Sequence, residues 1–234
     1  MRLYISFNLC KHELPKDYRK GFISLIKLIL DKDNPLLFRY YYSEKKPKSF
    51  TFNVYFPQGV KESTPNDFEV GNKAILQVSS NDIDFITAIN NGCHKIKDFQ
   101  LFYNQITFDK ALLIPLKRIH SEKVQLKTVS PFLINTRNDN SWYLVPGEKG
   151  FEKAFDKRFR EEISQWLGIT EFDYEIIPVN WKRCPITHYN QTMSGVKGEF
   201  IIKAPREILQ LIYDLGIGVR RSQGFGMLEI VKEF

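Results

Sequence analysis

The chain has few cysteines and no long apolar run, and each absence excludes certain classes of protein. Its three cysteines, Cys10, Cys93 and Cys184, are far apart and form no CxxC pair. A zinc ribbon needs paired cysteines and a disulfide framework needs an even set, so neither is expected. Free thiols favour a reducing cytoplasm. No apolar segment is long enough to span a membrane, and the first residues lack the unbroken apolar core of a signal peptide.

Acidic residues are fewer than basic ones, and the balance points to a polyanionic partner. The 234 residues include 34 Lys and Arg against 27 Asp and Glu, for a formal charge of +7. Nucleic acid is the commonest partner of such a chain, although a lysine-rich surface on an ordinary protein gives the same balance. Hydrophobic residues make up 43% of the chain and aromatic residues 14%. That content supports real cores and excludes a disordered chain.

Hydrophobic spacing in the first half predicts the order β-α-β-β-α-β. Period-two spacing predicts strands over 2–9, 49–56, 68–80 and 97–108. Helical spacing predicts one helix within 13–35, ended by Pro35, and a short helix over 81–92 with an Asn/Asp start and Gly92 as its stop. This order is that of the ferredoxin-like unit.

The second half repeats the pattern. Strands are predicted over 124–134, with 141–145 as a hairpin extension, and over 173–181, 196–204 and 225–234, with helices over 150–168 and 205–216. The second of these helices has proline at its start and glycine at its end. We therefore expect an α+β protein of two tandem ferredoxin-like (βαββαβ) domains. The boundary falls near residues 110–122, which divides the chain into 1–115 and 116–234.

The stretch GIGVRRSQGFG, residues 216–226, joins the last helix to the last strand and is called the glycine loop below. Glycine in a regular element costs up to about 1 kcal/mol relative to alanine, so a tight turn or a closely approaching ligand must recover that cost. A helix cap at Gly216 and a turn at Gly224 and Gly226 explain part of the pattern. Arg220 and Arg221 add charge that matches phosphate geometry. Because the loop follows a helix and opens a strand, it is not a dinucleotide fingerprint.

Two tandem ferredoxin-like halves with a C-terminal G-h-G-x5-G-h-G loop resemble the RAMP superfamily of CRISPR systems. More narrowly, the chain is similar to the repeat-processing endoribonucleases that cut the long precursor transcript into guide RNAs. The segments that carry the resemblance, besides the glycine loop, are RLYISF, LILDKDNP and LLFRYYYSEKKPKSFTF. The resemblance covers essentially the whole chain. It implies a metal-independent ribonuclease without a cofactor, in which a ribose 2′-OH attacks the adjacent phosphate and leaves a 2′,3′-cyclic phosphate.

The same resemblance implies a catalytic set, with one departure. Many members have a histidine six residues before the lysine that precedes F-T-F/Y; the lysine is Lys48 here, but Tyr42 stands at the histidine position. A tyrosine found on the first helix of some members falls at Lys27. The implied catalytic residues are therefore Tyr42, Lys48 and Lys27. A free tyrosine, with a pKa of about 10, is a poor base at pH 7, whereas histidine titrates at about 6.5.

Several interpretations of this departure stay open. Tyr42 can position RNA or act as an acid while the lysines stabilise charge, His12 or His188 can substitute for the missing base, or the chain binds repeat RNA without cutting it well. The plainer interpretation is that the tyrosines at 40–42 pack, that the lysines at 45–48 form a solvated loop, and that the histidines are ordinary.

Three basic clusters in predicted loops are candidate RNA contacts. The predicted RNA-binding residues are Gly216, Gly218, Arg220, Arg221, Ser222, Gly224, Gly226, Lys45, Lys46, Lys182 and Arg183. Basic groups beside aromatic side chains grip the backbone and stack unpaired bases, and Trp181 and Tyr189 are either such aromatics or core and rim residues.

Three functions compete at this point, and the first is favoured because the resembling family is dominated by nucleases. The first is a metal-independent endoribonuclease that cleaves precursor crRNA. The second is a repeat-RNA-binding protein of the same family with weak or no cleavage, within a CRISPR effector complex. The third is a basic module for other RNA or a structural subunit of a ribonucleoprotein. The expected partners are repeat RNA and effector subunits, with a homodimer left open and no membrane.

Overall fold

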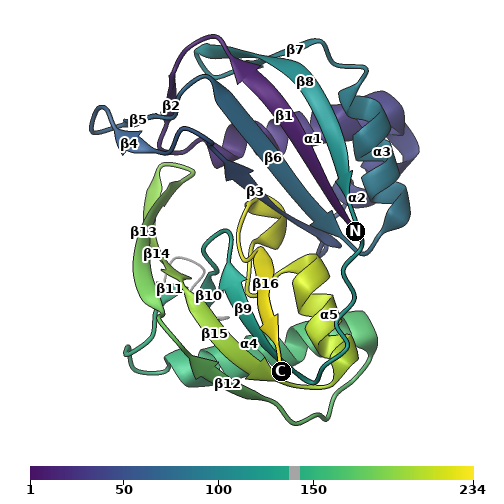
Figure 1. Cartoon of the computed structure of the whole chain (residues 1–234), viewed down its shortest axis with the longest axis vertical. Helices are drawn as coiled ribbons and strands as arrows, with labels where there is room; N and C mark the ends of the chain where they lie inside the picture. The colour runs from purple at the N-terminus through teal and green to yellow at the C-terminus, as the bar shows by residue number, and fades with distance from the viewer. Residues whose placement is uncertain (137–142) are drawn as a thin grey trace.

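Two main sheets, each covered by helices on one face, form the two halves of the protein (Figure 1), and the described residues also form one three-stranded and two two-stranded sheets. The computed structural model describes residues 1–136 and 143–234. In the first half the elements are β1 (Arg2–Leu9), β2 (Glu13–Pro15), α1 (Arg19–Asp33), α2 (Pro35–Tyr42), β3 (Phe50–Tyr55), β4 (Lys61–Glu62), β5 (Asp67–Glu69), β6 (Lys73–Ser80), α3 (Ile83–Cys93), β7 (Asp98–Leu101) and β8 (Asn104–Ile114).

In the second half they are β9 (Lys123–Thr128), β10 (Ile134–Asn135), β11 (Tyr143–Leu144), α4 (Phe151–Leu167), β12 (Glu175–Pro178), β13 (Lys182–His188), β14 (Gln191–Lys197), β15 (Glu199–Lys203), α5 (Arg206–Leu215), the 3-10 turn η1 (Arg221–Gln223) and β16 (Leu228–Glu233).

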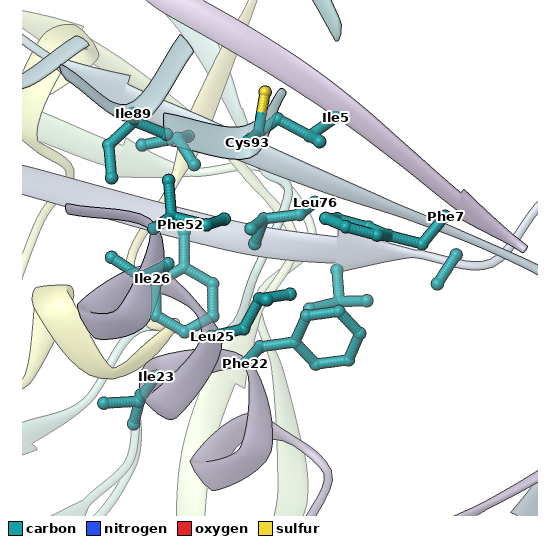
Figure 2. Packing of buried hydrophobic residues seen from close by; sticks show 14 of the residues in the cluster. Ile5, Phe7, Phe22, Ile23, Leu25, Ile26, Phe52, Leu76, Ile89 and Cys93 are labelled. Atoms are coloured by element: carbon teal, nitrogen blue, oxygen red, sulfur yellow. The ribbon is translucent and has the colours of Figure 1, made fainter. Parts of the chain in front are cut away.

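The first sheet has the strand order β3-β6-β1-β8-β7, with every neighbouring pair antiparallel. Alternate residues of central β1, such as Ile5 and Phe7, turn toward α1 and α3, because successive side chains of a strand point to opposite faces. Figure 2 shows Phe7 and Leu76 of the sheet packed toward Phe22 of α1. Part of the opposite face meets the second half of the protein, where Ser79 Oγ of β6 donates to Asp214 O of α5 at 2.7 Å.

The second sheet has the order β12-β15-β9-β16, also antiparallel. In both halves the second and third main strands lie on one side of the first, and the fourth lies on the other side. This arrangement is ferredoxin-like, so the predicted fold class of two tandem βαββαβ units is confirmed. Helices α4 and α5 cover one face of the second sheet, and the hairpin β13–β14 curves up beside the first half (Figure 1).

Buried hydrophobic residues fall into two main clusters, one drawn from residues 3–106 and the other from residues 119–228. The clusters support the expected division at residue 115, which stays a prediction. Polar bonds join the halves across the seam: Arg2 Nη1 pairs with Glu229 Oε2 at 2.7 Å, and Thr51 Oγ1 donates to Phe225 O at 2.8 Å.

Several predicted strand and helix boundaries differ from those in the structure. The predicted strands over 68–80 and 97–108 are each two strands, β5 and β6, and β7 and β8, because turns at Gly71 and at Phe102 interrupt them. The predicted stop at Gly92 was wrong: α3 runs to Cys93, and a Cβ at Gly92 would overlap the carbonyl of Ile29 on α1. Glycine is needed there for close helix packing.

Two elements near the candidate site were not predicted. Pro35 was taken only as the end of α1, but it is also the first residue of α2, whose cap Asn34 accepts a bond from the backbone N–H of Leu37 at 3.0 Å. The segment KRCPITHYN, predicted as a loop, forms β13 and the turn of the β13–β14 hairpin. Of the predicted hairpin extension over 141–145, residues 141 and 142 lie outside the described residues, and Tyr143 and Leu144 form β11 against β10.

Candidate functional site

The glycine loop packs tightly against the rest of the protein. All four glycines have positive φ, between 73° and 90°, a region that L side chains rarely adopt. A Cβ on Gly216 would lie 2.6 Å from Gly226 O, and one on Gly218 would lie 2.5 Å from Leu133 O. Gly226 itself donates its N–H to Pro131 O at 2.8 Å. The close approach that the glycines permit is therefore to the protein itself, to backbone at Gly216, Gly218 and Gly226 and to the Phe52 ring at Gly224, and their contact with RNA stays a prediction.

The two arginines of the glycine loop have different surroundings. Arg221 Nη1 forms an ion pair with Glu162 of α4, and both side chains are 9% exposed. Burial raises the pKa of the Glu162 carboxyl to about 7 and outweighs the opposing effects of Arg221 and the Gly218 N–H. Arg220, at φ 60°, is half-buried and lies over the Tyr143 ring at 5.4 Å. Arg221 thus has little surface to offer to a phosphate, whereas Arg220 has more.

A cleft of about 990 Å³ brings three separate segments together. Its walls are the 45–48 loop before β3, one side of α4, and residues 218–223, which include Ser222 and Gln223 of the glycine loop. The charged residues of the lining are Lys45, Lys46, Lys48, Arg158, Arg160, Arg220 and Arg221 against Glu161 and Glu162. We call this the basic cleft. Its seven cations outnumber its two carboxylates, so it favours an anionic ligand.

Arg158 and Arg160 belong to the basic cleft but were not predicted. Arg158 Nε donates to Asn135 O at 3.1 Å, and Arg160 Nε pairs with Asp156 at 2.9 Å. Their signal was present in the stretch KAFDKRFR of α4. It was missed because the phenylalanines spaced by four in that helix were read only as a core pattern.

The predicted catalytic residues do lie together. Tyr42 is the last residue of α2, Lys27 lies on α1 and Lys48 precedes β3. The two ammonium groups lie 4.9 and 5.0 Å from the centre of the Tyr42 ring. Cation–π attraction at this range is favourable. The three residues are called the Tyr42 cluster below.

The protonation states in the Tyr42 cluster are shifted by burial. The Tyr42 hydroxyl is buried and has no hydrogen-bond partner among the residues that the structure describes. Burial, and then the nearby Tyr189, raise the pKa of the Tyr42 phenol well above its ordinary value of 10. Burial, and then the charges of Lys27 and Lys46, lower the pKa of the Lys48 amine. Tyr42 therefore stays a neutral phenol at pH 7, and Lys48 gives up its proton more readily than an ordinary lysine.

The two histidines considered as substitute bases, His188 and His12, lie in very different surroundings. His188 is completely buried; its Nε2 lies 3.0 Å from Gln223 Oε1, and its Nδ1 lies 3.4 Å from Asp17 Oδ1. Burial lowers the pKa of the His188 imidazole despite these partners. His12 is exposed in the turn between β1 and β2. His188 is therefore internal, as the plainer interpretation expects, although its Nδ1 has no hydrogen-bond partner among the described residues.

Other predicted RNA contacts lie outside the basic cleft. Lys182 and Arg183 are exposed on β13 and do not line it. Trp181 packs against Phe132, Phe151 and Phe155 in the second core, which fits its core interpretation. Tyr189 is half exposed at the turn of the β13–β14 hairpin.

Among residues 1–136 and 143–234, no three His, Cys, Asp or Glu side chains are grouped as a metal site. Within the same ranges, no helix has the length and apolarity to cross a membrane.

Comparison with known proteins identifies the family. The family described as CRISPR associated protein Cas6, C-terminal, matches residues 114–230, which is half of the chain. The chain belongs to the Cas6 family. It is 24% identical over 236 residues to a Pyrococcus horikoshii protein named as a CRISPR-associated endoribonuclease-like protein, Cas6nc. That match covers 88% of this chain and 98% of the relative.

Solved structures share this fold at low identity. A Cas6-related protein from Pyrococcus furiosus has a TM-score of 0.86 at 20% identity, with 100% of this chain and 99% of that one covered. A RAMP protein described as binding different RNA substrates has a TM-score of 0.85 at 20% identity, covering 99% and 100%. A Cas6 product complex has a TM-score of 0.68 at 13% identity, covering 99% and 100%. These similarities show that the chain has the same fold as these proteins.

Proposed function

We propose that this Cas6 family chain binds the repeat of a CRISPR precursor transcript in the basic cleft and cuts it slowly or not at all. The observation that carries the proposal is the set of seven cations around one cleft at the meeting of the two halves. Arg221, Arg158 and Arg160 are each paired with a carboxylate. The net positive charge of the cleft therefore comes from Lys45, Lys46, Lys48 and Arg220. RNA phosphates suit such a surface.

The relatives support an RNA partner. One structural neighbour is described as a RAMP protein binding different RNA substrates, and another is a Cas6 product complex. The curated relative is named as endoribonuclease-like. The RNA in this proposal is the repeat, because the family is defined by its association with CRISPR.

The chemistry of the Tyr42 cluster argues against rapid cleavage. Attack by a ribose 2′-OH needs a base that is partly unprotonated near neutral pH. The Tyr42 phenol has a raised pKa, and the imidazole of His188 is enclosed by Asp17 and Gln223. Neither Tyr42 nor His188 therefore provides a proton acceptor suited to fast catalysis. Binding and holding RNA need no such acceptor.

One observation favours the second candidate, a metal-independent endoribonuclease that leaves a 2′,3′-cyclic phosphate. The lowered pKa of Lys48 suits a group that donates a proton to the leaving 5′ oxygen. The amine of Lys27, across the Tyr42 ring, would stabilise charge on the phosphorane. In this candidate Tyr42 positions the RNA, and the rate depends on orientation more than on proton transfer.

Incubation of the purified protein with its cognate repeat RNA in EDTA tests both candidates. We expect the repeat to bind more tightly than a scrambled RNA of equal length and to remain mostly uncut. The slow-cleavage proposal would be overturned, and the nuclease supported, by a rapid single cut in EDTA. That cut should leave a cyclic phosphate and should be slower in the Lys48→Ala variant. Equal affinity for repeat and scrambled RNA would contradict both and favour a module for other RNA.

A further inference from the structure

The turn of the β13–β14 hairpin has an unusual residue. His188 pairs with Gln191, so Tyr189 and Asn190 form a two-residue turn, and both have positive φ, at 49° and 60°. Turns of this kind strongly favour Asn and Gly because those residues tolerate positive φ. Asn190 fits this preference, whereas a bulky tyrosine in this region is a conformational outlier. An outlier of this kind invites a functional reason.

Internal packing does not explain Tyr189. The residue is 50% exposed, and the one ring contact of its side chain in the described structure is with the neighbouring His188, at 4.4 Å. Phe102 offers a contrast, since it also has positive φ, at 58°, but its ring lies against Gly21 of α1. Within residues 1–136 and 143–234, the exposed Tyr189 ring makes no ring contact with a distant segment.

The turn is nevertheless held firmly. His188 Nε2 is hydrogen-bonded to Gln223 of η1, its Nδ1 faces Asp17 at 3.4 Å, and the backbone N–H of Asn190 donates to Asp17 Oδ2 at 3.3 Å. Asp17 also pairs with Lys20 at 3.0 Å. Polar groups of both halves thus fix a surface turn in one place. A rigid aromatic group binds a ligand at lower entropic cost than a mobile one.

The surroundings of Tyr189 suit a nucleotide. Gln223, which holds His188, lines the basic cleft. The charges of Arg19 and Arg220 contribute to the lowered pKa of the His188 imidazole. The Tyr189 hydroxyl contributes to the raised pKa of the Tyr42 phenol, so Tyr189 lies near the Tyr42 cluster. An aromatic face beside cations is the usual site for stacking an unpaired base.

We propose that Tyr189 is a stacking residue, on which one unpaired base of the bound RNA lies between the basic cleft and the Tyr42 cluster. This inference rests on the proposed function, since it needs repeat RNA in the cleft. The stacked base would set the register of the RNA against Tyr42 and Lys48. His188 and Asp17 act as positioning residues that hold the ring in place.

Tyr189→Asn is the decisive variant, because asparagine tolerates the positive φ of this position and removes only the ring. We expect affinity for repeat RNA to fall about tenfold, within the range for one stacked base. Tyr189→Trp should retain the affinity. The salt dependence of binding should keep its slope, because no phosphate contact is lost. The matched control is Tyr55→Asn, which removes a ring of equal exposure (50%) at the end of β3, outside the lining of the basic cleft.

A fluorescence scan separates stacking from general damage. Repeat RNAs with 2-aminopurine at successive positions should show one position whose fluorescence changes on binding the wild-type protein but not the Tyr189→Asn variant. Unchanged affinity and an unchanged scan in a folded Tyr189→Asn variant would overturn the inference while leaving the proposed function intact. If the wild-type protein does not prefer the repeat, the proposed function fails instead.

Discussion

Arg221 of the glycine loop pairs with Glu162 of α4 inside the second half of the protein, at the base of the basic cleft. The pair ties a loop after α5 to a helix that lies some sixty positions earlier in the sequence. Arg221, chosen from the sequence as a phosphate ligand, therefore has an internal partner. Neighbouring Arg220 keeps its exposure to the cleft.

The two arginines should separate stability from binding. Arg221→Ala leaves the Glu162 carboxylate buried without its cation, so the free energy of unfolding should fall by about 3–5 kcal/mol. Arg220→Ala should change it by less than about 1 kcal/mol but should weaken RNA binding at low salt. Urea unfolding and RNA titration of both variants check this. Similar stability losses in the two variants would contradict the burial argument.

Stability should depend on pH through Glu162. The pKa of its carboxyl is raised from 4.5 to about 7, so the folded protein holds this proton more tightly than the unfolded chain. The stabilising contribution is complete below about pH 4.5 and is lost as pH rises through 7. The loss is at most about 3 kcal/mol. Urea unfolding between pH 4.5 and 8 should show this decline, relative to Glu162→Gln; parallel curves for the two proteins would exclude it.

The glycine loop should tolerate no side chain at Gly226. Its φ is 73°, and a Cβ would overlap the carbonyl oxygen of Ile217, which is backbone and cannot move aside cheaply. Gly59→Ala is the matched control, because φ is also positive there, at 85°, but no atom lies within 4 Å. We expect the control to cost about 1–2 kcal/mol and Gly226→Ala to cost clearly more, in thermal or urea unfolding. Equal losses of stability in the two variants would mean that the positive φ, and not the contact with Ile217, requires glycine at position 226.

Lysines inside and outside the basic cleft should differ in their effect on RNA binding. Lys46 lines the cleft, and Lys182 is exposed on β13 away from it. Lys46→Ala should weaken binding of repeat and scrambled RNA alike and lower the salt slope by about one. Lys182→Ala should change neither. A loss of affinity with Lys182→Ala instead would extend the RNA path along the hairpin.

Tyr42→His should raise the cleavage rate, because it places a titratable base between Lys27 and Lys48. The two ammonium groups disfavour the imidazolium, so the histidine should titrate below its usual pKa of about 6.5. The rate, measured on repeat RNA in EDTA, should therefore rise with pH and level off by about pH 7. Tyr42→Phe is the control and should not gain activity. No gain with Tyr42→His would mean that the RNA does not place its scissile phosphate at the Tyr42 cluster.

Local pattern determined much of this protein. Period-two and helical spacing place β1, α1, α4 and α5 where the structure has them, because a side chain's face in a regular element depends on its neighbours in sequence. The order of those elements then leads to two ferredoxin-like units. Smaller elements were not predicted where one residue has two roles. Pro35, for example, both follows the end of α1 and begins α2.

Only the tertiary structure decided which candidate residues share a site. It brings Lys46 and Arg220 to one cleft with Arg158, and it leaves Lys182 on the outside of a hairpin. It also buries Arg221 against Glu162. Such outcomes depend on distances between residues far apart in the chain and on the water that packing excludes. Local spacing does not carry that information, since a basic residue looks the same in sequence whether it faces solvent, a phosphate or a buried carboxylate.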